Sequence, residues 1–463
     1  MNFRPITLLS VVLVTFAVAS CSTFPKTDSL LAIDPSKGYR YDLLDASVNK
    51  DDLFVVVTFS GGGTRAAALA YGVLEELRRT TVTIRGEQRN LLKEVDVISS
   101  VSGGSFTAAY YGLRGDEIFE EGGRFQKNFL YHNVEANLVA RVANPYNWFR
   151  LASPKFGRIE LATELYQDLL FDNATFRNLA DARTKPYLMI NATDMTKGAA
   201  FTFVQSQFDP LCADLGSVSI ARAVAASSNF PIAFTPLTLN SYPGTCGYLD
   251  PDWVTGALHS FDVNPRRYYR ARMLERYQEK DRRYVHLLDG GVADNIGLRG
   301  PLTALESGDV MPSILNKINL EQIKTLVVII VDAKNETPTE FDRFPAPPGL
   351  VDVVNAIATV PLDNYSFDTL QLLQDVLRRR NDAQRQSADL FKVDLYRIAV
   401  SFDQIEDKAE RDRFFRIKTS FDLPDDEVNA LRRKGAELLR QSPCFQALVA
   451  PPAGRPANSW LCP

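Results

Sequence analysis

The chain has 463 residues, of which 45% are hydrophobic and 23% charged, the balance of an ordinary globular protein. Its 52 Lys and Arg residues against 56 Asp and Glu residues give a formal net charge of −4, which gives no electrostatic reason to expect a nucleic-acid partner. Histidine occurs only at His132, His259 and His286, which excludes a histidine-rich metal site. A catalytic triad based on histidine therefore has three candidates at most.

The N-terminal segment has the features of a secretory signal. The apolar and small-residue run over 6–20 is too short to span a bilayer comfortably, and it ends in a Val-Ala-Ser-Cys sequence at Cys21. This end resembles a bacterial lipobox, so we expect residues 1–20 to be a cleaved signal peptide and Cys21 to be lipidated. Ser22 follows in place of an acidic residue, which in such lipoproteins favours the outer membrane, facing the periplasm. The alternative is an ordinary cleaved signal with a chance cysteine.

The other cysteines are even in number, namely Cys212, Cys246, Cys444 and Cys462. In an oxidising compartment an even number favours disulfides, and proximity in sequence favours Cys212 with Cys246 and Cys444 with Cys462. None lies in a CxxC motif or near a histidine cluster, so we expect no zinc or other metal site. The alternative is a set of buried free thiols.

Strand, glycine loop and helix recur along the chain. The runs 53–59 and 94–100 are typical of buried strands, and each is followed by glycines and a helix, over 64–79 and from Gly103. Further strands are expected over 187–192, 199–204, 284–288 and 325–331, and an alanine-rich helix over 217–226. This recurrence predicts an α/β fold with a mostly parallel central sheet and helices on both faces.

The composition also predicts how the chain is divided. Residues 21–50 are polar and are interpreted as a tether, and residues 51–335 as the main domain. Residues 336–463 are expected to form a mainly helical extension packed on the same domain. In that extension the sequence predicts helices over 351–380 and 425–441, with one more strand over 394–402.

The first candidate site motif is the loop from Ser60 to Arg65, between the first strand and its helix. Gly61, Gly62 and Gly63 have no side chains, so their backbone N–H groups can converge on an anion near the start of the following helix. The loop is not a Walker motif, because no Gly-Lys-Ser/Thr follows at the right spacing. The alternative is a glycine turn that serves tight packing.

The second motif closes the second strand, at Ser102, Gly103 and Gly104. A serine between a strand and a helix matches a nucleophile elbow, in which the residues two before and two after the nucleophile must be small. Gly104 meets this requirement, and Ser100 stands where the motif usually has glycine. The alternative is a serine that caps a helix.

The third motif is Asp289, Gly290 and Gly291, directly after the strand expected over 284–288. The C-terminal strand ends of an open α/β sheet form the crevice where ligands bind, so this carboxylate can lie close to a neighbouring strand end. The alternative is an ordinary Asp-Gly turn.

Together the three motifs, in this order, resemble the patatin-like phospholipase family. The resemblance extends to residues 191–194, 223–236 and 289–298 and covers about residues 50–335. Two departures are Ser60, where the family often has Asp, and Ala66, where it often has Gly. The family implies a three-layer fold, a Ser–Asp dyad without a catalytic histidine, action on acyl esters of lipids, and no metal or other cofactor.

The residues themselves also favour a dyad. A serine nucleophile needs a base, and strand alternation points His286 away from the face that Asp289 occupies. Asp289 as the direct base of Ser102 is the simplest interpretation, with its pKa raised by burial. The N–H groups of the three glycines of the first loop would then hold the oxyanion. Arg65 would shape that loop or add positive potential, with a structural salt bridge as the alternative.

These features predict a lipid-anchored serine acyl hydrolase that cleaves phospholipid or lysophospholipid esters through an acyl-enzyme at Ser102. The alternatives are an acyltransferase that uses the same dyad and a catalytically silent lipid-binding envelope lipoprotein. The sequence does not indicate a protein partner.

Two regions have a composition compatible with lipid contact. Residues 266–283 carry eight basic and three acidic side chains, with Tyr269 among them, and we interpret them as a solvated helix packed on the core. Tyr146, Trp148 and Phe149 follow Pro145 and are interpreted as buried core aromatics, with a lid as the alternative.

Overall fold

The computed structural model describes residues 22–44, 53–84, 86–231, 233–301, 325–335 and 394–450, with a few isolated positions between 345 and 375. Residues 1–21 and Cys462 lie outside the described residues, as does nearly all of the helix expected over 351–380. Within the described part, no helix is long and apolar enough to cross a membrane.

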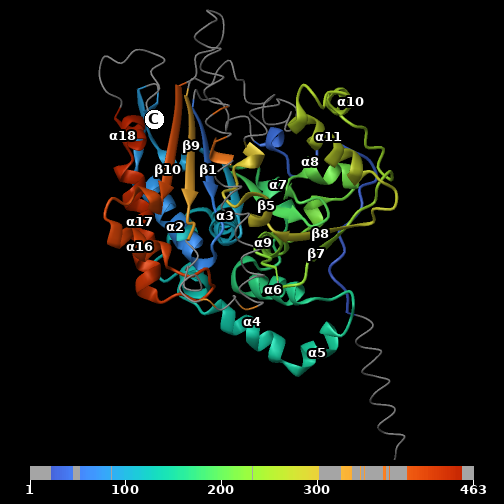
Figure 1. The fold of residues 1–463 in the computed structure, drawn as a ribbon, viewed down its shortest axis with the longest axis horizontal. Helices are drawn as coiled ribbons and strands as arrows, with labels where there is room; N and C mark the ends of the chain where they lie inside the picture. The colour runs from blue at the N-terminus through green and yellow to red at the C-terminus, as the bar shows by residue number, and fades with distance from the viewer. Residues whose placement is uncertain are drawn as a thin grey trace, which may run out of the picture.

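Among the described residues, an eight-stranded sheet forms the centre, with the strand order β10-β9-β1-β4-β5-β8-β7 and β6 paired to β5 (Figure 1). The bounds are β1 (Leu53–Phe59), β4 (Val95–Val101), β5 (Tyr187–Asp194), β6 (Ala199–Thr202), β7 (Leu237–Asn240), β8 (Tyr284–Asp289), β9 (Thr325–Asp332) and β10 (Asp394–Ser401). The strands from β10 to β5 pair in parallel, and β6, β7 and β8 pair antiparallel. The expected mostly parallel sheet is confirmed.

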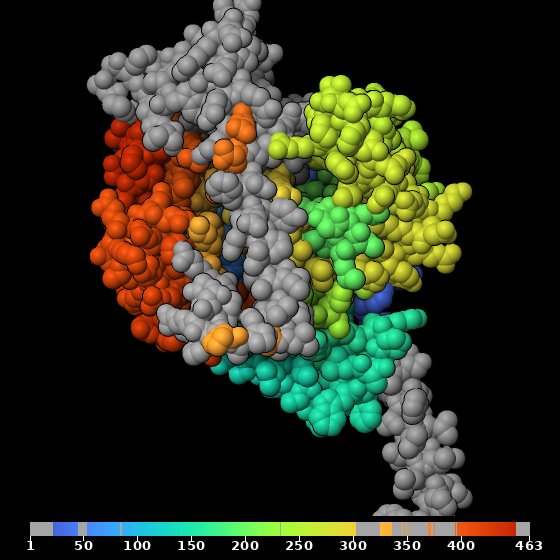
Figure 2. Space-filling model, in the orientation of Figure 1, coloured from blue at the N-terminus to red at the C-terminus, as the bar shows by residue number. Residues whose placement is uncertain are grey.

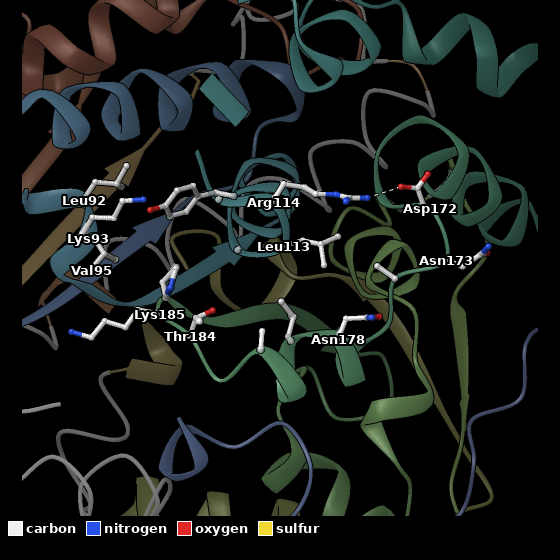
Figure 3. Close-up of a pocket in the computed structure, with 17 residues that line it drawn as sticks. Leu92, Lys93, Val95, Leu113, Arg114, Asp172, Asn173, Asn178, Thr184 and Lys185 are labelled. Atoms are coloured by element: carbon white, nitrogen blue, oxygen red, sulfur yellow. Dashed lines mark hydrogen bonds and ion pairs between the residues drawn. The ribbon is translucent and has the colours of Figure 1, made fainter. Parts of the chain in front are cut away.

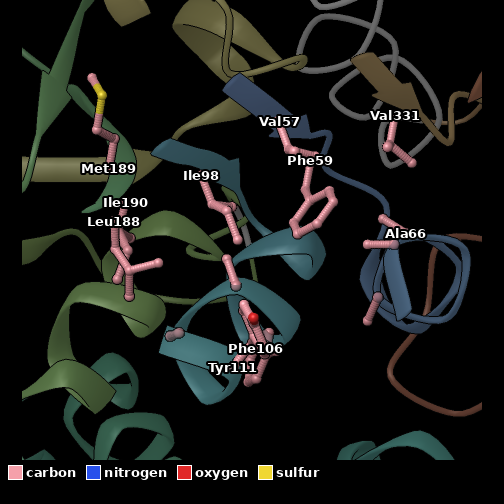
Figure 4. Packing of buried hydrophobic residues seen from close by; sticks show 14 of the residues in the cluster. Val57, Phe59, Ala66, Ile98, Phe106, Tyr111, Leu188, Met189, Ile190 and Val331 are labelled. Carbon is pink, nitrogen blue, oxygen red and sulfur yellow. The ribbon is translucent and has the colours of Figure 1, made fainter. Parts of the chain in front are cut away.

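The middle strands are buried along their whole length. Every residue of β1 and β4 is buried, because helices cover the sheet and leave no face of these strands to water. Figure 4 shows the packing, in which Phe59 of β1 and Ile98 of β4 lie above Phe106 of the following helix. Burial of β-branched and aromatic side chains on both faces is what fixes these strands and the loops that follow them.

A buried carboxylate occupies an irregularity between β1 and β4. The register shifts between Val55 and Val56, which places Asp96 opposite the shift. Asp96 accepts a hydrogen bond from the Val55 N–H over 2.7 Å and forms an ion pair with Lys185 over 2.6 Å. Burial raises the pKa of Asp96 to about 7, and Lys185 opposes that rise. This carboxylate thus satisfies a backbone donor that the shifted ladder would otherwise leave unpaired.

Helices surround the sheet. Two of them, α2 (Gly63–Arg79) and α3 (Gly103–Arg114), directly follow β1 and β4, and α17 (Asp425–Gln441) packs along α2. Glycines permit that close approach, since a Cβ on Gly72 would lie 1.9 Å from the Arg432 carbonyl oxygen and one on Gly435 would lie 2.4 Å from that of Leu69.

The remaining elements lie around this centre. They are β2 (Thr81–Ile84), β3 (Glu87–Asn90), α4 (Val134–Ala143), α5 (Pro145–Leu151), α6 (Arg158–Tyr166), α7 (Phe176–Ala182), α8 (Gln205–Phe208), α9 (Ile220–Ser227), α10 (Asp252–Leu258), α11 (Pro265–Tyr277), α12 (Gly291–Asp294), α16 (Lys408–Phe415) and α18 (Pro443–Val449). In Figure 1, α4 and α5 lie at the end of the molecule toward which the arrow of β9 points.

Both ends of the described chain pack on the domain that contains the central sheet. β10 pairs with β9 over its whole length, so the C-terminal part adds a strand to the central sheet and not only helices. At the other end, Tyr39 and Tyr41 are buried, and Tyr39 stacks on Tyr187 with ring centroids 4.6 Å apart. Tyr39 and Tyr41, in the stretch expected to be a tether, are therefore packed against the domain.

The described cysteines are bonded. Cys212 and Cys246 form a disulfide with a Cα–Cα separation of 5.4 Å, and Cys444 is disulfide-bonded as well. The alternative of buried free thiols is wrong for these three residues.

Candidate active site

Ser102 stands at a tight turn between β4 and α3. Its φ of 49° and ψ of −122° are unusual for a residue with a side chain, as a nucleophile elbow requires. The two glycines after it allow the turn to pack, because a Cβ on Gly104 would lie 2.6 Å from the Phe59 Cβ and one on Gly103 would lie 2.0 Å from the Gly63 carbonyl oxygen. The turn is buried, and the Ser102 side chain lies against the glycine loop after β1.

Asp289 is the residue that Ser102 contacts. The Ser102 hydroxyl donates a hydrogen bond to the Asp289 Oδ2 over 2.9 Å, although the two residues are 187 positions apart. The pairing of β8 with β5 sets Asp289 opposite Ala192, near the C-terminal end of β4. The other carboxylate oxygen, Oδ1, accepts from the Gly291 N–H over 2.8 Å, which orients the group.

The environment of Asp289 favours its neutral form. Burial raises the pKa of Asp289 to about 7, against the lowering effect of its hydrogen bonds from Gly291 and Ser102. A carboxyl group with this pKa exchanges its proton near neutral pH, which suits a general base.

The glycine loop lies beside Ser102, but its three N–H groups are not equivalent. The Gly61 N–H donates to the Asn295 carbonyl oxygen over 2.9 Å, so the expectation that it holds an oxyanion is wrong. Neither Gly62 nor Gly63 has a hydrogen-bond acceptor for its N–H among the residues that the structure describes. Both glycines have positive φ, 136° and 60°, a conformation that side chains disfavour. These two N–H groups remain as donors for an anion.

Gly61 has a different role in the geometry. A Cβ at this position would lie 2.4 Å from the Asn295 Oδ1 and 3.2 Å from the Ser102 Cβ. The missing side chain of Gly61 therefore makes room for Ser102 and Asn295, and its N–H holds the loop through the bond to the Asn295 carbonyl oxygen.

A model of the patatin-like phospholipase family matches residues 57–302, more than half of the chain. The chain belongs to the patatin-like phospholipase family. All three motifs lie within the matched residues. The resemblance inferred from the sequence is confirmed at the level of the family.

Two solved structures resemble this patatin-like chain. Human GIVD cytosolic phospholipase A2 has 12% identity and a TM-score of 0.29, with 68% of this chain and 49% of that chain covered. VipD from Legionella pneumophila has 11% identity and a TM-score of 0.30, with 85% and 67% covered. This chain thus spans about half the length of the human enzyme. No curated protein matches the chain.

None of the three histidines of this patatin-like protein is hydrogen-bonded to Ser102 or Asp289. His286 is exposed, and its Nδ1 lies 3.1 Å from the Thr238 hydroxyl, on a side of β8 away from Ser102. The rings of His132 and His259 contact Asn137 and the Thr255 carbonyl oxygen. Within the described residues, Asp289 is the only titratable group hydrogen-bonded to Ser102.

Arg65 is buried, and its guanidinium supports the glycine loop through hydrogen bonds to neighbouring segments. Its Nε donates to the Ala333 carbonyl oxygen over 2.7 Å and its Nη1 to that of Ile417 over 2.6 Å. A third bond, from Nη2 to the Asn335 Oδ1, spans 3.0 Å. The guanidinium thus ties the start of α2 to the end of β9 and to the C-terminal region, which fits the loop-shaping role.

Ser227 is a site residue that sequence analysis did not single out. Its hydroxyl accepts from the Ser102 N–H over 2.9 Å and donates to the Asn191 carbonyl oxygen over 2.6 Å. Its own carbonyl oxygen accepts from the Gly290 N–H over 3.0 Å. One residue of α9 thus holds the elbow, β5 and the Asp289 turn together.

A separate hollow of about 560 Å³ lies at the opposite end of the sheet (Figure 3). Val95, which begins β4, and Pro186, just before β5, line it, and an Arg114–Asp172 ion pair of 2.6 Å closes one side. Ser102 follows the other end of β4, so this hollow is no part of the candidate active site.

Proposed function

We propose that this protein hydrolyses acyl esters of phospholipids or lysophospholipids, with Ser102 as nucleophile and Asp289 as base. The observation that carries the proposal is the 2.9 Å hydrogen bond from the Ser102 hydroxyl to the Asp289 carboxylate. Family membership supports the lipid ester as the class of substrate.

In the first half of the proposed reaction, Asp289 accepts the hydroxyl proton as the Ser102 Oγ attacks the ester carbonyl carbon. The carbonyl oxygen becomes an oxyanion, to which the free N–H groups of Gly62 and Gly63 can donate. The ester C–O bond then breaks, and the leaving alkoxide takes the proton from Asp289. The products are a deacylated lipid alcohol and an acyl ester on Ser102.

Water completes the cycle. Asp289 takes a proton from a water molecule as its oxygen attacks the acyl carbon, and the second tetrahedral centre forms at the same donors. When it collapses, Ser102 leaves and regains its proton from Asp289, and the fatty acid is released. The dyad works in both halves because a base with a pKa near 7 both accepts and returns a proton at neutral pH.

The assay for this proposal measures fatty-acid release from a panel of phospholipids and lysophospholipids by wild type, Ser102→Ala and Asp289→Asn. We expect release by the wild type and loss in both variants, with circular dichroism unchanged. Retention of activity in Ser102→Ala would refute the mechanism. Transfer of the acyl group to an added alcohol, without fatty-acid release, would replace hydrolysis with acyl transfer.

We further propose that the protein is anchored in the bacterial envelope through a lipid on Cys21. The lipobox-like sequence supports this, and the chain that follows is held at the protein surface. The Ser153 hydroxyl donates to the Ser22 carbonyl oxygen over 2.6 Å, and the Phe24 N–H donates to the Lys155 carbonyl oxygen over 2.8 Å. Mass spectrometry of the processed N-terminus tests it, and an unmodified internal Cys21 in the mature protein would contradict it.

A further inference from the structure

The helices α4 and α5, residues 134–151, carry apolar side chains that no core covers; we call this segment the aromatic arm. Tyr146 is 65% exposed, Trp148 59%, Phe149 44% and Val139 67%. The expectation that the three aromatic residues are core is therefore wrong. Figure 2 shows the arm as a teal lobe at the lower edge of the molecule. Exposed aromatic groups gathered on one projecting segment mark an interaction surface.

Hydrogen bonds through the C-terminal region connect the arm to the glycine loop. The N–H of Thr64, in the first turn of α2, donates to the Ser420 carbonyl oxygen over 2.9 Å. The Ser420 hydroxyl in turn donates to the Glu135 Oε1, in the first turn of α4, over 2.6 Å. The Phe421 N–H donates to the same carboxylate oxygen over 2.8 Å. Two hydrogen-bonded steps thus connect the glycine loop to the base of the arm.

The charges of the arm are already matched. Arg150 hydrogen-bonds the Glu164 carboxylate of α6, and Arg141 is paired with Asp168. Both arginines are largely covered, at 20% and 27% side-chain exposure, whereas the aromatic groups project further. The surface that the arm offers is therefore apolar and aromatic, with no large net charge.

The residue chemistry favours a lipid surface as the occupant. Tyr and Trp have an apolar ring and a polar tip, which suits the boundary between headgroups and acyl chains. The end of α5 is also where the N-terminal segment is held, since Ser153 binds Ser22, the residue after Cys21. A membrane at this face would meet the arm, the start of the mature chain and the side of the molecule that carries the dyad.

We propose that the aromatic arm is the membrane-docking surface of this protein, which inserts Tyr146, Trp148 and Phe149 into the headgroup region of a bilayer and so presents Ser102 to lipid esters. This proposal rests on the proposed hydrolase function and adds how the enzyme meets its substrate. Because the arm's arginines are paired, docking is expected on zwitterionic phosphatidylcholine and at high salt, where electrostatic attraction is screened.

The hairpin of α10 and α11 provides a matched control. It also exposes apolar side chains, with Phe261 at 48%, Val263 at 88% and Tyr269 at 61%. Its aromatic rings contact one another, at 5.2 Å for Phe261 and Tyr268, and Ala271 and Tyr277 of α11 are buried. The hairpin thus offers a similar apolar exposure, and it lies away from the arm in Figure 1.

The experiment compares the full chain as wild type, as an arm variant (Tyr146→Ser, Trp148→Ser, Phe149→Ser) and as a hairpin variant (Phe261→Ser, Val263→Ser, Tyr269→Ser). All three share one N-terminus, so any lipid on it contributes equally. Each protein is assayed on phosphatidylcholine vesicles and on a soluble short-chain ester. The soluble ester reports the dyad alone, and circular dichroism reports folding.

We expect the arm variant to lose at least about 10-fold in activity on vesicles, since each 1.4 kcal/mol of lost binding is about tenfold in affinity. Its activity on the soluble ester should remain within about twofold of wild type, and the hairpin variant should match wild type in both assays. Equal vesicle activity of the arm variant and wild type would overturn the docking proposal. A wild type inactive on both substrates would instead contradict the proposed function.

Trp148 gives a direct readout of insertion. The chain has three tryptophans, and Trp148→Phe removes only the one on the arm. With vesicles of brominated phosphatidylcholine, we expect quenching of wild-type fluorescence that persists at high salt and is absent in Trp148→Phe. If wild type is not quenched, or if the arm variant changes only the oligomeric state measured by light scattering, the arm binds protein and the membrane proposal is wrong.

Discussion

The Ser227 hydroxyl accepts a hydrogen bond from the backbone N–H of Ser102, over 2.9 Å, at the point where the elbow has its strained φ. This contact joins a residue of α9 to the nucleophile of the proposed reaction. The backbone conformation of Ser102 thus depends on a side chain 125 positions away along the chain.

We expect Ser227→Ala to lower kcat by about 10-fold, because an unsatisfied buried donor at the elbow costs about 1–3 kcal/mol and loosens the turn. KM for a soluble ester should change little, since Ser227 makes no contact that the substrate requires. The measurement is kcat and KM with thermal unfolding as control. Unchanged kcat with lowered thermal stability would mean that Ser227 is purely structural.

The pKa of Asp289 predicts the acid side of the pH profile. Asp289 must be unprotonated to accept the Ser102 proton, so kcat/KM should rise with pH and level off above a pKa of about 7. His286→Ala should leave this limb in place, because His286 is exposed and bonded to Thr238. Disappearance or displacement of the limb in His286→Ala would assign the base to that histidine.

The same pKa also predicts how stability depends on pH. Burial raises the pKa of Asp289 from 3.8 to about 7, so between these values the folded protein keeps a proton that the unfolded chain has lost. The protonated Asp289 therefore stabilises the folded state relative to its ionised form. This stabilisation is present below about pH 4 and is lost as pH rises through about 7.

Asp289→Asn removes this titration. Relative to wild type, the variant should gain stability at pH 8, by up to about 4 kcal/mol, and gain little at pH 4. Denaturant unfolding of both proteins at the two pH values measures the difference. A stability difference that is the same at both pH values would show that Asp289 is not a buried, proton-holding carboxyl group.

The glycine loop should act through backbone donors. Gly62→Val places a side chain at a φ of 136° and within 2.9 Å of the Arg65 Nη2, so the loop must move. Loss of one oxyanion donor typically lowers kcat by about 10²–10³. KM should change far less, because the oxyanion charge exists only in the transition state. A folded Gly62→Val enzyme with wild-type kcat would show that this loop serves packing alone.

The sequence predicted those parts of the site that local rules determine. Ser102 follows a strand and Asp289 ends one, both precede glycines, and the chain has few histidines to compete for the role of base. The buried strands were predictable from local sequence too, because continuous β-branched and aromatic runs such as 53–59 are typical of strands buried on both faces.

Features that depend on tertiary contacts were not predictable. The Asn295 carbonyl oxygen takes the Gly61 N–H, and nothing in the local sequence of either residue indicates that bond. Likewise, Trp148 and Phe149 lie in an apolar stretch that is typical of a core, and only the position of α5 on a projecting arm exposes them. The local sequence does not distinguish Ser227 from any other serine near the end of a helix, because its role depends on the position of α9 beside the elbow.

The proposed reaction depends on acylation of Ser102 with Asp289 as its base. The most direct measurement is peptide mapping by mass spectrometry after the protein reacts with a fluorophosphonate, which forms a stable adduct on an activated serine. We expect one adduct, on Ser102, which forms rapidly in wild type and in His286→Ala and far more slowly in Asp289→Asn. An adduct on another residue, or labelling of Ser102 at the wild-type rate in Asp289→Asn, would contradict it.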